Sequence, residues 1–220
     1  MKDGSKIWNF NTEKPFINPL KKLSIVIENN LVIFNNSLGD ITAVNIESGA
    51  LEWQISTHNS DDLNEIISLK TSNLIIDENK IFFSNNKNVF YSVDLNTGNI
   101  NWKQNISSSV KPAVIGDLLF TISDNGYLFL IDKNRGNIVR INDIFKNFKP
   151  KVKKNLVPTG FILDANNLYV STNFGKLLIV NIENASTKEI LKIGKGKLSR
   201  PFVKNQNLFL IKDNAIIKLN

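Results

Sequence analysis

An internal repeat limits what this chain can fold into more than any other feature of its sequence. Four segments align without gaps: Gly39–Trp53, Asn88–Trp102, Gly126–Arg140 and Gly175–Glu189. The first residues of successive segments lie 49, 38 and 49 positions apart, and a fifth, shorter copy begins 39 positions later at Asn214. A period of about 44 residues is long enough for one supersecondary unit that must stack on its neighbours to bury an apolar face. The sequence therefore predicts an array of similar units.

Each segment carries the same four positions. It opens with a turn residue, has Asp or Asn six residues later, a glycine ten residues later in three of the four segments, and a tryptophan fourteen residues later in the first two. An Asp side chain can accept backbone N–H groups of the turn that follows it, and glycine allows the positive φ that closes such a turn. A tryptophan on an outer strand can fill the space between two sheets while its indole N–H reaches a carbonyl. The residues to which we assign these structural roles are Gly39, Gly49, Trp53, Asp94, Gly98, Trp102, Gly126, Asp132, Gly136 and Gly175.

Each repeat also contains a pair of apolar strands ahead of the aligned segment. Leu23–Ile27 and Leu31–Phe34 form one such pair, joined by the polar turn 28–30. Asn and Asp in these turns tolerate the positive φ that tight hairpins require. Apolar residues with helical spacing are confined to stretches of a few residues. The sequence thus predicts an all-β chain built from four-stranded antiparallel meanders.

Four-stranded sheets repeated around an axis form a β-propeller, which protects sheet edges by radial packing. We expect a single, partial propeller domain over residues 1–220 with about five blades. The expected blades span about residues 1–12 (the end of a blade), 20–57, 72–106, 111–143, 157–193 and 199–220 (the start of a blade).

Composition excludes several kinds of site. The chain has no cysteine and a single histidine, His58, so disulfides, thiolate metal sites, cysteine nucleophiles and His-pair metal sites are ruled out. His58 shares one loop with Ser60, Asp61 and Asp62, and neighbours in a loop do not easily converge on a substrate as a catalytic triad does. The net charge of +7 comes from lysines spread along the chain, without a recognition helix or a basic stripe with aromatics. We expect no nucleic-acid partner.

The segment NVFYSVDLNTGNINW, residues Asn88–Trp102, resembles the repeat of quinoprotein-type propellers. Over nearly its whole length the chain is most similar to the C-terminal part of the BamB family of outer-membrane assembly factors. Features that support this resemblance are the long connection Ser60–Ser72, the weaker third and fourth repeats, and an ending that runs strand, turn, strand to the last residue.

The resemblance implies a function. Members of the family are eight-bladed periplasmic lipoproteins that scaffold the β-barrel assembly machinery of Gram-negative bacteria. It implies a non-catalytic protein without cofactor or metal, peripheral at the outer membrane and held there through a lipid anchor. Its partners would be the barrel-forming, BamA-like subunit and nascent outer-membrane proteins.

The chain departs from the family pattern in length. It has about five repeats where the family has eight, and it shows neither a signal peptide nor a lipidated cysteine. We expect an N-terminally truncated copy, because Gly4 and Trp8 have the spacing of the last two repeat positions. The alternative is a closed five-bladed ring, in which the strand with Trp8 completes the sheet begun at Pro201.

Two long connections are candidate partner-binding surfaces, since function concentrates in loops longer than the fold requires. In the first, residues 59–71, acidic and apolar side chains are mixed, a composition that could dock a basic groove or pair with a partner's edge strand. The resemblance implies that the partner surface lies there. The residues that we expect to bind are Asp61, Asp62, Leu63, Glu65, Ile66 and Ile67. The second, Asp143–Pro158, has Phe145 and Phe148 ahead of four lysines, an exposed mixture that could equally contact anionic lipid headgroups.

Two other functions stay open at this point. Quinoprotein oxidoreductases share the repeat, but their vicinal disulfide needs two cysteines and their calcium and quinone site needs a complete ring. A generic five-bladed ligand-binding or adhesion propeller is the other alternative. The basic stretch Gly194–Lys197 does not open a helix after a strand, so we interpret it as a turn between blades and not as a phosphate loop.

Overall fold

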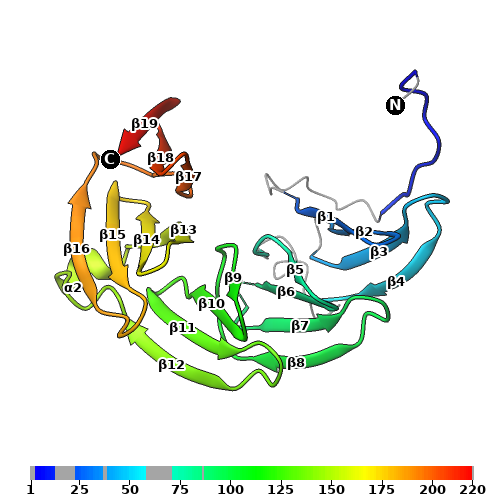
Figure 1. The fold of residues 1–220 in the computed structure, drawn as a ribbon, viewed down its shortest axis with the longest axis horizontal. Helices are drawn as coiled ribbons and strands as arrows, with labels where there is room; N and C mark the ends of the chain where they lie inside the picture. The colour runs from blue at the N-terminus through cyan, green and yellow to red at the C-terminus, as the bar shows by residue number, and fades with distance from the viewer. Residues whose placement is uncertain (1–2, 13–22, 37–38, 58–70, 86, 220) are drawn as a thin grey trace. The chain divides into compact units, whose positions relative to one another are not determined.

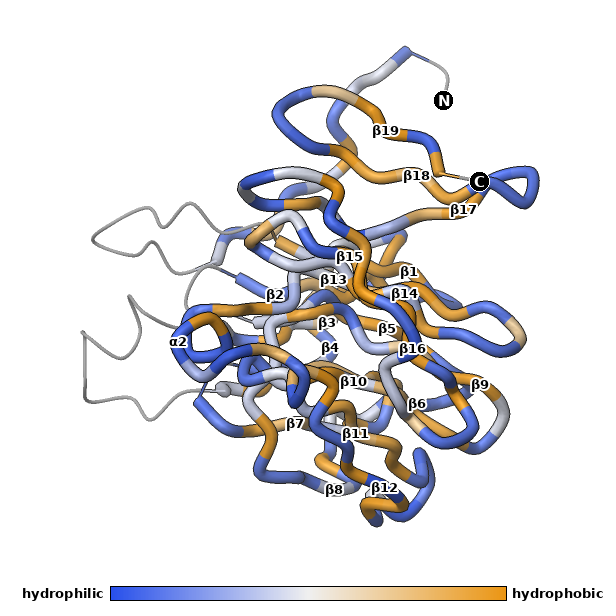
Figure 2. Tube along the Cα trace, turned by 90° about the vertical axis from the view of Figure 1, so that its left-hand side faces the viewer, coloured by the Kyte–Doolittle hydropathy of each residue, from blue (hydrophilic) through white to orange (hydrophobic). Residues whose placement is uncertain are grey.

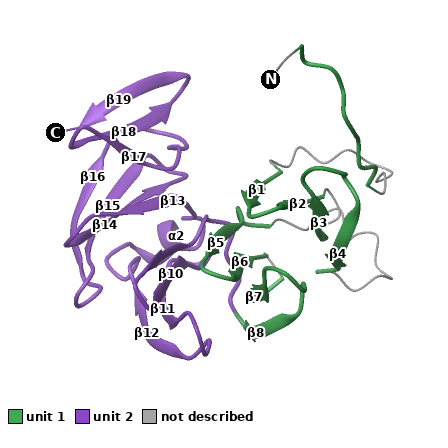
Figure 3. Cartoon of the chain, turned by 45° about the vertical axis from the view of Figure 1, so that its right-hand side comes forward, with its two compact units in different colours: residues 1–105 green, residues 106–220 purple. Residues whose placement is uncertain are grey.

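The structure is a computed structural model, and it describes residues 3–12, 23–36, 39–57, 71–85 and 87–219. The chain forms two compact units, Met1–Asn105 and Ile106–Asn220 (Figure 3). Each unit is described by itself. The expectation of one domain with the stated blade limits stays a prediction.

The described residues of unit 1 form two four-stranded antiparallel sheets (Figure 1). Each is a simple meander in which every strand pairs with the next one along the chain. The first consists of β1 (Ile25–Glu28), β2 (Leu31–Asn35), β3 (Ile41–Asn45) and β4 (Leu51–Ile55), and the second of β5 (Ile75–Asp77), β6 (Lys80–Ser84), β7 (Phe90–Asp94) and β8 (Ile100–Gln104).

Unit 2 contains two four-stranded sheets, one three-stranded sheet and one short helix. The four-stranded sheets are β9 (Ala113–Ile115), β10 (Leu118–Ile122), β11 (Tyr127–Asp132) and β12 (Ile138–Asp143), and then β13 (Pro158–Leu163), β14 (Asn167–Thr172), β15 (Lys176–Asn181) and β16 (Thr187–Lys192). The third sheet is β17 (Phe202–Lys204), β18 (Asn207–Lys212) and β19 (Ala215–Leu219), and the helix is α2 (Pro150–Lys153). The predicted all-β fold of antiparallel meanders is confirmed.

The four repeat positions fall at equivalent points of the four-stranded sheets. In each sheet the Asp or Asn position ends the third strand. The residue fourteen positions after the start of the repeat segment lies on the fourth strand. The pairing register repeats as well, because Ala43 lies opposite Trp53 and Ser92 lies opposite Trp102. In both sheets the pairing between the third and the fourth strand shifts register just after this residue pair. Such a bulge adds local twist to an outer strand.

The two middle strands of each four-stranded sheet carry most of the core. In β6 and β7, eight of ten residues are buried, whereas in the outer strand β8 no residue is. Figure 2 shows hydrophobic residues along the strands and hydrophilic ones at the turns. In unit 1, one apolar cluster joins the two sheets through residues such as Ile33, Trp53 and Phe83. In unit 2, Phe120, Phe145, Phe161 and their neighbours form the corresponding cluster between the two four-stranded sheets. Stacked sheets therefore share their cores within each unit.

Candidate functional site

The turn after each third strand is built on an acidic or amide side chain. Asp94 Oδ1 accepts hydrogen bonds from Asn96 N (3.0 Å), Thr97 N (2.9 Å) and the Thr97 hydroxyl (3.0 Å). Burial alone would raise the pKa of Asp94, but these bonds, with the charge of Lys80, lower it below the usual value. Gly98 N, at a φ of 71°, then bonds to the Asp94 carbonyl at 3.0 Å.

The same turn occurs with other side chains. Asp132 accepts bonds from Arg135 N (2.9 Å) and Asn134 N (2.8 Å), and these two bonds lower its pKa. Asn45 accepts bonds from Glu47 N (3.0 Å) and Ser48 N (3.1 Å). Gly49 and Gly136 close their turns at φ values of 71° and 77°. An amide therefore serves in this position as well as a carboxylate does.

Two tryptophans of unit 1 link an outer strand to the next turn. Trp53, only 8% exposed, donates from Nε1 to the Leu95 carbonyl at 3.0 Å. Trp8 donates in the same way to the Ile46 carbonyl at 3.0 Å. In both cases the acceptor directly follows the Asp or Asn position of the receiving turn. Trp102 stacks on Phe90, with ring centroids 6.0 Å apart.

Unit 2 makes related contacts without tryptophan. Arg140, fourteen residues after the start of its repeat segment, donates from its guanidinium to the Glu183 carbonyl, two residues after the Asn181 position. Phe145 fills the space beside Gly126, where an added Cβ would lie 2.0 Å from the ring. The sequence did not predict these contacts of Arg140 and Phe145. The one signal that could have found Arg140 is its position in the repeat, where a side chain with N–H donors stands in place of an indole.

The remaining assigned glycines lie at turns. Gly39 and Gly175 have positive φ values of 94° and 66°, and each precedes a third strand. The Gly39 carbonyl accepts the Thr57 hydroxyl at 2.6 Å. The Gly175 carbonyl accepts Ile193 N at 2.9 Å. These glycines thus connect the third strand to the end of the fourth.

The six residues predicted to bind the partner, Asp61, Asp62, Leu63, Glu65, Ile66 and Ile67, lie outside the described residues, as do His58 and Ser60. The assignment of a partner surface to residues 59–71 stays a prediction.

The second candidate connection differs from the expectation of exposed phenylalanines. Phe145 is fully buried, and Phe148 packs against it edge-on with centroids 5.9 Å apart and an interplanar angle of 88°. Phe145 turns inward because the space between the two sheets needs a large apolar side chain where no tryptophan is present. The prediction that both rings are available to a lipid surface is therefore wrong. The lysines of this connection point to a different kind of contact.

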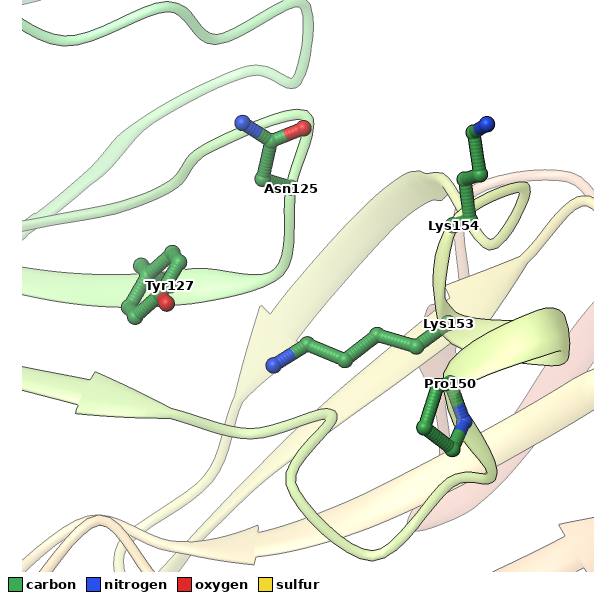
Figure 4. Close-up of a pocket in the computed structure, with 5 residues that line it drawn as sticks. All are labelled: Asn125, Tyr127, Pro150, Lys153 and Lys154. Carbon is green, nitrogen blue, oxygen red and sulfur yellow. The ribbon is translucent and has the colours of Figure 1, made fainter.

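A pocket of about 420 Å³ lies between the turn before β11 and helix α2 (Figure 4). Its lining residues are Asn125, Tyr127, Pro150, Lys153 and Lys154. The Lys153 ammonium forms an ion pair with Asp143 Oδ2 and lies 5.6 Å from the centre of the Tyr127 ring. The hydrogen bond to Asp143 raises the pKa of Lys153; burial opposes this rise, and the electrostatic interactions with Asp143 and Tyr127 add to it. Lys153 is therefore a fixed positive charge at neutral pH.

The described part of the chain contains no group of three or more His, Cys, Asp or Glu residues that could hold a metal ion. Within the same residues, no helix has the length and hydropathy to cross a membrane.

Solved structures with similar folds include two propellers. BamB from Moraxella catarrhalis superposes with a TM-score of 0.76 at 17% identity, over 98% of this chain and 63% of that one. The Cps50 (Swd1) β-propeller domain from Myceliophteria thermophila superposes with a TM-score of 0.64 at 11% identity, over 85% of this chain and 60% of that one. The chain thus spans less than two thirds of either structure. These similarities show the fold, and the five sheets are blades of a β-propeller.

Comparison with curated proteins finds no match. A family model described as outer membrane protein assembly factor BamB matches residues 1–142, which is more than half of the 220 residues. With the propeller fold and the repeated turns in place, that match shows that the chain belongs to the BamB family of PQQ-repeat propellers.

Proposed function

We propose that this protein is a non-catalytic scaffold of the outer-membrane β-barrel assembly machinery. The observation that carries the proposal is the family match over residues 1–142, in a chain whose sheets form propeller blades. A scaffold needs rigid elements that hold its loops in fixed positions. The described turns supply that rigidity, because their backbone groups bond to side chains such as Asp94 and Asp132.

The partner that we propose is the barrel-forming, BamA-like subunit, with nascent outer-membrane proteins as further clients. We assign its binding to Asp61, Asp62, Leu63, Glu65, Ile66 and Ile67, where acidic and apolar side chains are mixed. Apolar residues would supply most of the binding energy, and the carboxylates would orient the partner by charge. The setting would be the periplasmic side of the outer membrane, with attachment through a lipid anchor.

Capture of the periplasmic region of a BamA-like subunit on immobilised protein tests this proposal. Replacing Leu63, Ile66 and Ile67 by Ser should reduce capture at least tenfold, while circular dichroism stays unchanged. A control variant in the same loop, Asn64→Ala with Ser68→Ala, should bind like the wild type. Full capture by the triple variant would remove this loop from the proposal, and no capture by the wild type would remove the proposed partner.

The proposal includes the absence of catalysis. Because quinoprotein dehydrogenases share the repeat, purified protein should be incubated with calcium, pyrroloquinoline quinone, an alcohol and an electron-accepting dye. We expect no dye reduction above that of the protein-free mixture. Quinone-dependent oxidation would replace the scaffold by an oxidoreductase.

A further inference from the structure

The pocket between the turn before β11 and helix α2 does not belong to the surface assigned above, and we call it the Tyr127 pocket. Its lining residues, Asn125, Tyr127, Pro150, Lys153 and Lys154, come from two parts of the chain that unit 2 brings together (Figure 4). We propose that the Tyr127 pocket binds carboxylate side chains of an acidic peptide segment in a partner protein.

Lysines are concentrated in the connection that lines one side of the pocket. The connection from β12 to β13 carries five lysines and no acidic residue between Asp143 and Asp164, and these lysines are Lys146, Lys149, Lys151, Lys153 and Lys154. Asp143 is already bonded to Lys153. Among the described residues, no carboxylate forms a salt bridge with Lys154, whose side chain lies at the pocket. The pocket therefore presents the ammonium group of Lys154, which no described carboxylate neutralises, beside the paired Lys153.

The groups around the pocket are held in place before any ligand arrives. Asp143 fixes Lys153 with Oδ2 and accepts Phe145 N with Oδ1 at 2.9 Å, so a buried residue anchors the carboxylate. Tyr127 N donates to the Ser123 hydroxyl at 3.0 Å, which fixes the start of β11. Preorganised cations lose less conformational entropy when they bind an anion.

The shape and composition of the pocket favour a peptide over a lipid surface. A hollow of about 420 Å³ is large enough for one or two side chains. The tyrosine ring and Pro150 give it an apolar wall, against which the methylene groups of Glu can lie. Membrane binding by a basic segment gains strength from apolar side chains that insert between lipids. Here Phe145 is buried and Phe148 is partly buried against it, so Val152, 39% exposed, is the most exposed large apolar side chain of this connection.

The test uses two peptides and the full chain. The first probe is a ten-residue peptide of alternating Glu and Thr, labelled with fluorescein and amidated at its C-terminus, and the second has Gln in place of every Glu. Fluorescence anisotropy measures binding in low and in physiological salt. We expect the Glu peptide to bind, with an affinity that falls as salt rises, and the Gln peptide to bind at least tenfold more weakly.

Variants locate the binding. Lys153→Gln with Lys154→Gln should weaken binding of the Glu peptide about tenfold or more, since it removes two charge-assisted contacts. The control is Lys204→Gln with Lys218→Gln, which removes the same charge from exposed positions on the three-stranded sheet of the same unit. The control should bind within twofold of the wild type. Circular dichroism checks that both variants keep their strand content.

Three results would overturn the proposal. No binding of the Glu peptide at millimolar concentration would refute a carboxylate site. Equal losses in the two lysine variants would show attraction by net charge alone. Vesicles with anionic phosphatidylglycerol that bind the wild type but not Lys153→Gln with Lys154→Gln, while the peptide binds neither protein, would assign the pocket to a lipid surface.

Discussion

Replacing Gly98 by alanine tests how the sheets of unit 1 are joined. Gly98 has a φ of +71°, and a Cβ added there would lie 2.8 Å from Cδ2 and Cε3 of Trp53. The ring has little room to move, because Trp53 is 8% exposed and its Nε1 is bonded to the Leu95 carbonyl. The substitution therefore introduces both backbone strain and a clash with a held aromatic ring.

The two effects can be separated in magnitude. A left-handed conformation costs a residue with a Cβ about 1 to 2 kcal/mol, and the lower entropy of the unfolded alanine chain offsets about 0.5 kcal/mol of this. Overpacking against a rigid neighbour adds about 1 to 3 kcal/mol. We expect Gly98→Ala to lower the free energy of unfolding by about 2 to 4 kcal/mol. Gly116→Ala, at a φ of +56° with no atom within 4 Å of the added Cβ, should cost only about 1 kcal/mol.

Urea unfolding measures these differences. All three tryptophans lie within residues 1–105, so intrinsic fluorescence follows unit 1, and far-ultraviolet circular dichroism follows the Gly116 control. In a Trp53→Leu background, Gly98→Ala should cost only about 1 kcal/mol, because the ring that it strikes is gone. An equal cost of Gly98→Ala with and without Trp53 would refute the idea that the Trp53 ring joins the two sheets by packing against Gly98.

Two further predictions concern the Asp94 turn of unit 1, and a third concerns the core of unit 2. Asp94→Ala should lower the free energy of unfolding by about 1 kcal/mol, whereas Asp94→Asn should cost less because Asn45 makes the same turn; thermal unfolding distinguishes the two. The lowered pKa of folded Asp94 contributes stability above the unfolded value of about 3.9, and this contribution is lost as pH falls through the folded pKa. The difference in urea midpoint between wild type and Asp94→Asn should therefore shrink from pH 6 to pH 3, and a constant difference would contradict the assignment. Phe145→Ala should destabilise unit 2 by about 3 to 5 kcal/mol, measured by circular dichroism, and a loss below 1 kcal/mol would show that the ring is not part of the core.

The sequence alone predicts the local structure well. Strand limits follow from alternating apolar residues, and turns follow from Asp, Asn and Gly at fixed offsets. Both signals lie in the same short stretch of sequence as the structure that they determine. The all-β meanders were predictable on that basis, and the family was predictable from the resemblance of Asn88–Trp102 to a known repeat. The four-residue helix α2 was not, since it is too short for a hydrophobic period to reveal it.

Contacts between distant segments were harder to predict. Phe145 sits in a lysine-rich connection, and nothing in its neighbours indicates that Gly126 leaves space for its ring. The same limit applies to the Tyr127 pocket, which needs residues from two connections more than twenty positions apart in sequence. Tertiary packing decides which of these side chains turn inward.

The guanidinium of Arg140 has a consequence for how far relatives can be recognised. The family model ends at residue 142, two positions past this arginine, yet sheets continue to Leu219. In this chain the N–H group that reaches a neighbouring carbonyl from that place belongs to an indole in Trp53 and to a guanidinium in Arg140. A sequence pattern written for tryptophan alone would therefore pass over the repeat that carries Arg140.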